Sequence, residues 1–158
     1  MSEWKTKKLG DLIHIKHGYG FKGRYFTDNG SYILLTPGNF YDKGGFKHTS
    51  RTKYYVGPIP EDFIHKRNDL IVAMTEQAEG LLGSTAFVPE DNKYLHNQRL
   101  GLISILDKFE LDKRFLYRLF NTPIVRLQIR ASANGAKVRH TSPSRIYLVK
   151  MGLRRNVG

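Results

Sequence analysis

Short apolar runs of strand length occupy the middle of the chain. Residues 70–75, 84–88 and 100–105 are mostly apolar, and polar, glycine-bearing connections separate them. Runs of this length that are bounded by turn residues are typical of buried strands. The pattern therefore predicts three neighbouring strands at the centre of the fold.

Further strands are predicted on both sides of this centre. Residues 32–36 form an apolar run that a Pro-Gly pair ends, and residues 145–149 form a final one near the C-terminus. Residues 39–55 interleave five aromatic residues with four cations around a Gly-Gly pair. Because paired glycines favour tight turns, this segment is interpreted as a hairpin-like excursion.

The segment after the central strands has the periodicity of two helices. Asp112 is the expected N-cap of a helix that runs to residue 121, and Pro123 is the expected first residue of a second helix. The apolar stripes expected to face the core are Phe115, Leu116, Leu119 and Phe120 in the first helix and Ile124, Leu127 and Ala131 in the second. Arg126 and Arg130 form a basic pair on the second helix, and simple solvation is the favoured interpretation of both.

These elements define the expected fold class. A chain of 158 residues with 40% apolar residues suits one domain with its own core. Short strands with turn-rich connections outnumber the helices. We therefore expect an α+β fold: a single domain with a mixed, mostly antiparallel β-sheet and a few helices, including a C-terminal helical pair.

Positive charge is concentrated in the last third of the chain. The formal net charge is +12. Residues 1–112 hold 15 Lys and Arg with all 14 Asp and Glu, whereas residues 113–158 hold 11 Lys and Arg and no acid. Such an excess indicates a polyanionic partner, nucleic acid before an anionic membrane. A generic solvated basic surface is the alternative.

Other bulk features narrow the class of protein. No apolar run approaches the ~20 residues of a membrane helix, and no signal peptide precedes the start. Cysteine is absent, which excludes a disulfide framework and a thiol nucleophile. A cytoplasmic protein without a membrane partner is expected.

The sequence lacks the motifs of common catalytic sites. It has no Asn/Asp-Pro-Pro-aromatic tetrapeptide of an amino-methyltransferase, no Gly-rich phosphate loop and no metal-binding His spacing. Asp91 and Lys93, with Asp69 or Glu79 as a distant acid, leave a metal-dependent nuclease as an alternative, although they occur in a turn. We therefore expect no catalytic residues and no metal ligands.

Loops that combine cations, amides and aromatic residues are the candidate contacts to nucleic acid. Cations neutralise phosphates, whereas amides and guanidinium groups read base edges. The candidate DNA-binding residues are Lys22, Arg24, Lys43, Lys47, Arg51, Lys53, Gln98, Arg99, Lys137, Arg139 and His140. For the loops at 18–26 and 39–55, the alternative is a surface loop whose aromatic residues pin it to the core.

A series of short motifs runs in order along nearly the whole chain. They are Trp4 and residues 9–13, 18–22, 69–75, 83–86, 97–101, 115–117 and 133–140. In this order they resemble the target recognition domain of the DNA-specificity (S) subunits of type I restriction-modification systems. Each motif alone is weakly specific, and the ordered series carries the resemblance.

The resemblance implies a function without catalysis in this chain. Such a domain enters the DNA major groove and reads one half of a split target site for the modification subunits. S-adenosylmethionine, ATP and Mg are then expected only in the modification and restriction subunits. The resemblance therefore implies a non-catalytic subunit that recognises double-stranded DNA.

The C-terminal end departs from the family pattern. Residues 1–150 are expected to form the recognition domain and residues 151–158 a short basic tail, without the spacer helix and second recognition domain that the family usually has. We therefore expect a split or truncated subunit, or a fragment. Docking onto modification and restriction subunits then needs spacer helices from elsewhere, and a homodimer is also open.

Gln98 and Arg99 need separate treatment. The Asn-Gln-Arg series recurs in family members with different targets, so these two residues are expected to shape the framework rather than to read bases. An RNA-binding basic domain and a metal-dependent nuclease are the alternative functions, together with an inert remnant of a broken gene.

Overall fold

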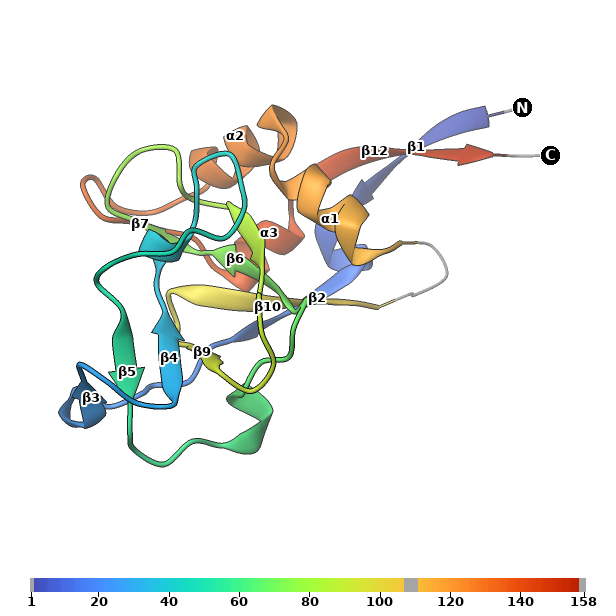
Figure 1. Ribbon diagram of the computed structural model, residues 1–158. Helices are drawn as coiled ribbons and strands as arrows, with labels where there is room; N and C mark the ends of the chain where they lie inside the picture. The colour runs from blue at the N-terminus through green and yellow to red at the C-terminus, as the bar shows by residue number, and fades with distance from the viewer. Residues whose placement is uncertain (1, 107–110, 157–158) are drawn as a thin grey trace.

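A four-stranded antiparallel sheet forms the centre of the molecule (Figure 1). The computed structural model describes residues 2–106 and 111–156. The sheet has the order β2-β10-β6-β8, with β2 (Ile13–His17), β10 (Leu100–Ile105), β6 (Leu70–Ala73) and β8 (Thr85–Phe87). The three central strands predicted from the apolar runs are therefore confirmed as neighbours.

Strand β6 separates two clusters of the core. Leu70 and Val72 pack in one cluster, and Ile71 and Ala73 pack in the other. Because successive side chains of a strand point to opposite faces, a strand that is buried on both faces needs a continuous apolar run. This explains why the sequence shows no polar alternation here.

A second four-stranded sheet lies beside the first (Figure 1). Its order is β3-β5-β4-β9, with β3 (Phe26–Thr27), β5 (Lys53–Tyr55), β4 (Tyr32–Leu35) and β9 (Tyr94–His96). Among the described strands only β4 and β9 pair in parallel. The excursion predicted for residues 39–55 closes through a bridge between Phe40 and Phe46 and returns to this sheet as β5.

Helices cover the cluster on the other side of β6. They are α1 (Lys113–Phe120), α2 (Pro123–Ala131) and α3 (Pro143–Tyr147), and they bury Leu116, Phe120, Val125, Ile129 and Ile146. The predicted N-cap is confirmed, because Asp112 Oδ1 accepts a 3.0 Å hydrogen bond from the Phe115 amide. Short 3-10 helices lie at Leu9–Asp11, Gly23–Tyr25, Pro37–Asn39 and Glu61–Phe63.

The predicted core stripe of α2 was wrong. Val125 and Ile129 are the buried residues of this helix, whereas Ile124 and Leu127 are exposed. The helix carries apolar residues on two faces, so periodicity alone does not choose between them. Which face is buried follows from Arg126, which anchors α2 to two distant loops described below. Phe115, predicted to join the stripe of α1, is likewise exposed.

The final strand predicted at residues 145–149 was also wrong. Ser142 and Pro143 open helix α3 instead: the Ser142 hydroxyl accepts from the Arg145 amide at 3.4 Å, and Pro143 occupies the first turn. The strand begins later, as β12 (Lys150–Asn156), and pairs antiparallel with β1 (Ser2–Lys8). The described part of the predicted basic tail, residues 151–156, therefore forms a strand.

A small ribbon completes the fold. It pairs β7 (Thr75–Glu76) with β11 (Arg139–His140). The α+β class, the single domain and the mostly antiparallel sheets agree with the sequence expectation. Among the described residues, no helix is both long and apolar enough to span a bilayer.

Candidate nucleic-acid interface

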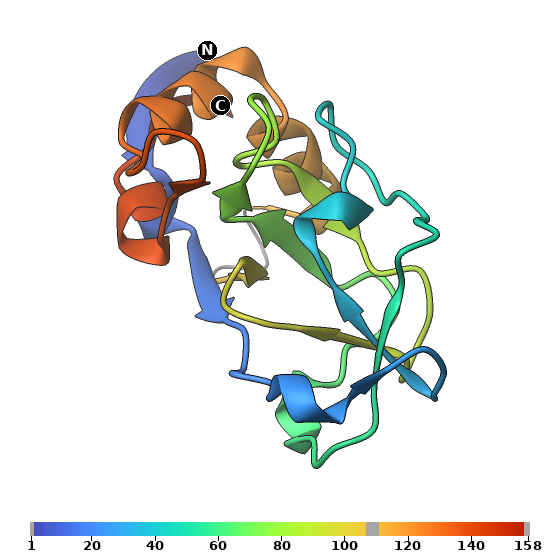
Figure 2. The ribbon, with the colours of Figure 1, turned by 90° about the vertical axis from the view of Figure 1, so that its left-hand side faces the viewer.

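The candidate contact residues lie on loops along one side of the molecule. Residues 22–24, 98–99 and 137–140 lie on the face that Figure 2 presents, and residues 43–53 run along its right-hand margin (Figure 2). Ten of the eleven predicted side chains are exposed, and Arg139 is partly buried. The strands β1 and β12 extend from the far side of this face (Figure 1). Loops from distant parts of the chain thus present cations and amides together.

Aromatic rings hold several of these cations in place. The basic groups lie 4.9, 5.7 and 5.9 Å from the ring centroids. The pairs are Arg24 on Tyr25, Lys47 on Tyr41 and Lys53 on Phe26. Each such contact stabilises an exposed pair by about 0.5–1 kcal/mol. The alternation of aromatic and basic residues in the sequence therefore serves both to pack the loops and to orient their charges.

A tight turn at residues 97–99 lies at the centre of the candidate face. The Asn97 side chain accepts from the Arg99 amide at 3.1 Å, and the Arg99 carbonyl accepts from Met74 at 2.8 Å. Gly18 packs so closely that a Cβ there would collide with the backbone of residues 96–97. Asn97 therefore shapes the turn, while Gln98 and Arg99 are exposed and the Gln98 amide lies beside Gly20.

Two buried histidines support this turn from beneath. His65 Nδ1 lies 3.1 Å from Asp69 Oδ2, His65 Nε2 lies 2.7 Å from His96 Nδ1, and His96 Nε2 lies 3.1 Å from the Lys16 carbonyl. Burial, reinforced by the charge of His65, lowers the pKa of His96 to about 3. His96 is therefore neutral at physiological pH. No local sequence pattern predicts this pair, because its members are 31 residues apart.

Asp69 is the carboxylate at the end of the hydrogen-bonded series formed by His96 and His65. Burial tends to raise its pKa, but hydrogen bonds from His65 and from the Lys66 amide, with the charges of His65 and Lys113, outweigh burial and lower it. The Lys66 amide lies 3.0 Å from Asp69 Oδ2. Asp69 is thus occupied in fixing the loop that precedes β6.

A hairpin at residues 134–140 forms the second prominent loop of the face. Asn134 and His140 exchange backbone hydrogen bonds of 2.9 Å in both directions, and Gly135 at the turn has a φ of +99°. His140 Nδ1 lies 3.1 Å from the Thr75 hydroxyl. Lys137 is exposed at the tip, whereas Arg139 donates to the Arg130 carbonyl at 2.8 Å. Arg139 thus ties the hairpin to α2.

The loop beside this hairpin is built around a buried carboxylate. Glu76 Oε2 accepts from the amides of Gly80, Leu81 and Leu82 at 3.1, 2.9 and 2.9 Å. Glu76 is 1% exposed and lies directly opposite Arg139 in the β7–β11 ribbon. These three bonds compensate Oε2 for its burial, whereas Oε1, which is also buried, has no hydrogen-bond partner among the described residues. Glu76 therefore has a structural role in positioning residues 80–82.

Arg126 joins the loops to α2, and its interpretation as a solvated side chain was wrong. Its guanidinium donates to the carbonyl groups of Asp42, Gly80 and Phe120 at 2.6, 2.9 and 3.0 Å. It also donates to Asn121 Oδ1 at 2.9 Å. Burial lowers the pKa of Arg126 below its ordinary value, yet a guanidinium remains charged at neutral pH. One half-buried cation thus fixes two loops that border the candidate face.

Comparison with known families decides what this scaffold is. A family model described as the type I restriction modification DNA specificity domain matches residues 1–139. The chain belongs to this family. A search of curated proteins finds no match.

Solved structures share the fold of this specificity domain. The S subunit of the type I restriction-modification system from M. genitalium aligns with a TM-score of 0.65 and 20% identity, over 96% of this chain and 34% of that one. A structure titled for complex assembly and conformational transition of the type I R-M system gives 0.63 and 15%, over 95% and 34%. The HsdS subunit from Thermoanaerobacter tengcongensis gives 0.61 and 15%, over 95% and 33%. The chain therefore spans about a third of the length of these subunits.

The specificity domain does not assemble the acids of the nuclease alternative. Asp91 Oδ1 accepts from the Arg67 amide at 2.8 Å, Asp69 is engaged by His65, and Glu79 pairs with Arg130 at 3.2 Å. Across residues 2–106 and 111–156, no group of three or more His, Cys, Asp or Glu is arranged to hold a metal ion. The described acids thus have structural partners instead of a shared site.

Proposed function

We propose that this specificity domain binds double-stranded DNA and reads a short sequence as one half of a split target. The family match over residues 1–139 is the observation that carries the proposal. The exposed cations along one side of the domain support it, since phosphate contacts supply most of the affinity of such proteins.

The turn at residues 97–99 and the hairpin at residues 134–140 suggest different roles in DNA binding. Lysines at exposed loop tips, such as Lys137, neutralise phosphates and act on all sequences alike. Gln98 and Arg99 project from a rigid turn and carry the amide and guanidinium groups that suit base edges. Because the Asn97 side chain bonds within the turn and Arg139 bonds α2, we now propose Gln98 and Arg99 as base contacts and Arg139 as a support of the hairpin.

We further propose that methyl transfer and cleavage belong to other subunits. The domain would deliver modification subunits to a DNA site, and those subunits would supply S-adenosylmethionine chemistry. A restriction subunit would supply ATP- and Mg-dependent steps. This assignment rests on the family and on the lack of a motif for either chemistry in the sequence.

The test is duplex-DNA binding by the purified chain with selection from a random-sequence pool at two salt concentrations. We expect a consensus of a few base pairs and an affinity that falls as salt rises. Single-stranded RNA serves as competitor. Binding without a consensus would reduce the proposal to a basic surface, and preferential binding of the RNA would overturn it.

A further inference from the structure

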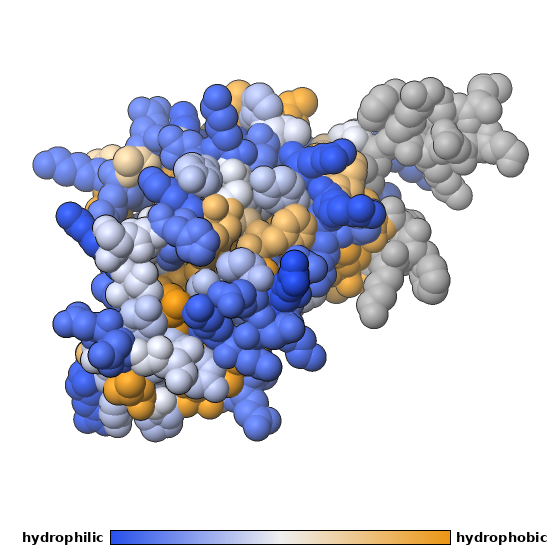
Figure 3. All heavy atoms as spheres, viewed as in Figure 1, coloured by the Kyte–Doolittle hydropathy of each residue, from blue (hydrophilic) through white to orange (hydrophobic). Residues whose placement is uncertain are grey.

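Helix α2 is apolar on its outer face as well as its inner one. Ile124 and Leu127 are 65% and 62% exposed, and Ala131 is exposed one turn further on. These positions are spaced i, i+3 and i+7, which is the spacing of the contact seam of a coiled coil. Single exposed apolar residues are ordinary, but a stripe along one helix marks a contact surface. Apolar surface is visible at the top of the molecule, over α2 (Figure 3).

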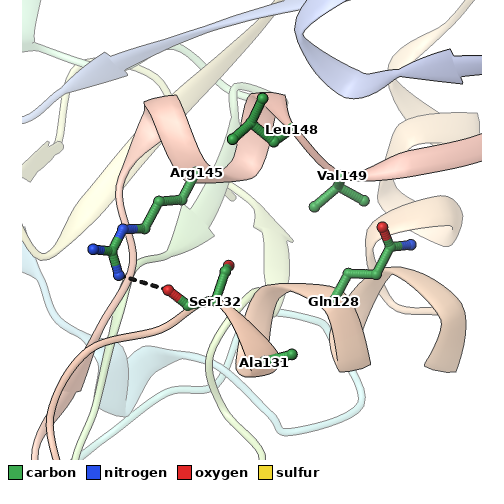
Figure 4. Close-up of a pocket in the computed structure, with 6 residues that line it drawn as sticks. All are labelled: Gln128, Ala131, Ser132, Arg145, Leu148 and Val149. Carbon is green, nitrogen blue, oxygen red and sulfur yellow. Dashed lines mark hydrogen bonds between the residues drawn. The ribbon is translucent and has the colours of Figure 1, made fainter.

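A pocket lies beside the stripe. Its volume is about 340 Å³, and it lies between α2 and α3 (Figure 4). Its lining consists of Gln128, Ala131, Ser132, Arg145, Leu148 and Val149. Ala131 belongs to both the stripe and the pocket, and Leu148, 61% exposed, adds a further apolar side chain at the rim. A knob-like side chain next to α2 would therefore find a hollow to enter.

The pocket is rigid and its rim is basic. Gln128 bonds the Lys150 amide at 2.9 Å and the Lys150 carbonyl at 2.8 Å, which fixes the start of β12 against α2. Arg145 donates to the Ser132 carbonyl at 2.6 Å across the opening (Figure 4). No acid occurs in residues 113–158. The charged residues that residues 113–158 place around the outer face of α2 are therefore all cations.

Acids that approach α2 do so from its other side. Glu79 pairs with Arg130 at 3.2 Å, and the Asp42 carbonyl accepts from Arg126. Glu76 is buried among the amides of residues 80–82. Glu79 and the Asp42 carbonyl thus bind the arginines of α2 that face the loops. None of them lines the pocket.

We propose that the stripe and pocket form a docking surface for an acidic amphipathic helix of another polypeptide. Such a helix would place apolar residues along Ile124, Leu127 and Leu148 and carboxylates near Arg145 and Lys150. A second copy of this chain fits poorly, because it would bring a net charge of +12 against an identical charge. A flat anionic membrane does not fill a pocket. None of the residues of the stripe or the pocket is among the proposed DNA contacts.

The test uses the full chain and two designed peptides. Both are amphipathic helices of about three heptads with Leu at the seam, one flanked by Glu and the other by Lys. The variants Leu127→Glu and Ile124→Glu remove the stripe at positions whose exposure lets the fold tolerate a charge. Val56→Glu, at a position 62% exposed beyond β5, is the matched control. Circular dichroism verifies folding, and duplex-DNA binding is measured on every variant.

We expect the Glu-flanked peptide to bind the native chain and the Val56→Glu variant equally. Binding should fall at least about tenfold for Leu127→Glu, and the Lys-flanked peptide should not bind. DNA binding should be the same in the native chain, Leu127→Glu and Ile124→Glu, so a failed DNA assay and a failed docking assay are distinguishable. Equal binding of both peptides would overturn the proposal. Two further results would overturn it. In one, Leu127→Glu abolishes self-association of the chain and leaves peptide binding unchanged. In the other, Leu127→Glu abolishes binding to vesicles of phosphatidylserine and phosphatidylcholine and leaves peptide binding unchanged.

Discussion

The two central loops of the candidate interface are supported by opposite chemistry. The turn at residues 97–99 rests on His65 and His96, of which His96 is neutral at physiological pH. The loops around the hairpin at residues 134–140 rest on Arg126 and Glu76, whose charges bond backbone groups. Both arrangements hold an exposed loop on a buried polar group.

The difference determines which change destabilises each loop. A charged group that is half buried leaves several unpaired carbonyl or amide groups when it is removed, so the charged support is costly to lose. A neutral histidine costs less to bury but must not be protonated, so the neutral support is sensitive to acid. Substitutions and pH should therefore distinguish the two regions.

The largest effect is expected at Arg126. Arg126→Ala removes the donor to the backbone carbonyl groups of residues 42, 80, 82 and 120 and to Asn121. We expect a loss of about 4 kcal/mol in the free energy of unfolding, measured by urea denaturation. Arg130→Ala is the control, because its exposed pair with Glu79 should contribute less than about 1 kcal/mol. Equal losses in both variants would contradict a clamp at Arg126.

Gly18→Ala should be next in size. The added Cβ collides with the backbone of residues 96–97, so the turn or the preceding loop has to shift. We expect a loss of about 3 kcal/mol, at the upper end of overpacking effects, from thermal or urea unfolding. Gly23→Ala, where the nearest atom is 4.0 Å away, should change stability by less than about 0.5 kcal/mol. A tolerated Gly18→Ala would show that the turn is not tightly packed.

The pH dependence should identify the neutral support. The folded-state pKa of His96 is about 3, below the ordinary value of 6.5, so unfolding takes up a proton below pH 6.5. The stabilising contribution is complete above pH 6.5 and is lost as pH falls, by about 2 kcal/mol at pH 5. Asp69, whose pKa is lowered from 3.8, acts only at more acidic pH. His96→Gln should flatten the stability profile between pH 7 and 5, and an unchanged profile would refute the assignment.

The smallest effect on stability is expected at the hairpin tip. Lys137→Ala removes an exposed cation, so unfolding should change by less than about 0.5 kcal/mol. The slope of log affinity against log salt for duplex DNA should fall by about 1. Gln98→Ala should leave that slope unchanged and alter the selected sequence. If Gln98→Ala weakened all sequences alike, its assignment to base contact would be wrong.

Local signals in the sequence were sufficient for the elements that short-range chemistry determines. The three apolar runs and the Asp112 N-cap are of this kind, because the pattern of a buried strand or of a capped helix is complete within a few residues. The Ser142-Pro143 start of α3 was also a local signal, and the apolar run that followed it was misinterpreted as a strand.

The remaining features depend on partners far away in the chain. The rotation of α2 is set by contacts of Arg126 with residues 42 and 80, which no periodicity reveals. Strand β12 exists because β1, at the opposite end of the chain, pairs with it. The histidine pair and the buried Glu76 likewise require knowledge of the fold. The exposure of the cations, in contrast, was predictable because Lys and Arg side chains in polar loops are ordinarily exposed.

Amide hydrogen exchange with and without the selected DNA duplex tests most directly which face of the domain binds DNA. The account predicts protection at residues 18–24, 97–99 and 134–140, which lie on the face in Figure 2, and none along β1 and β12. Protection confined to β1, β12 or the outer face of α2, with the central turn and the hairpin unchanged, would contradict it.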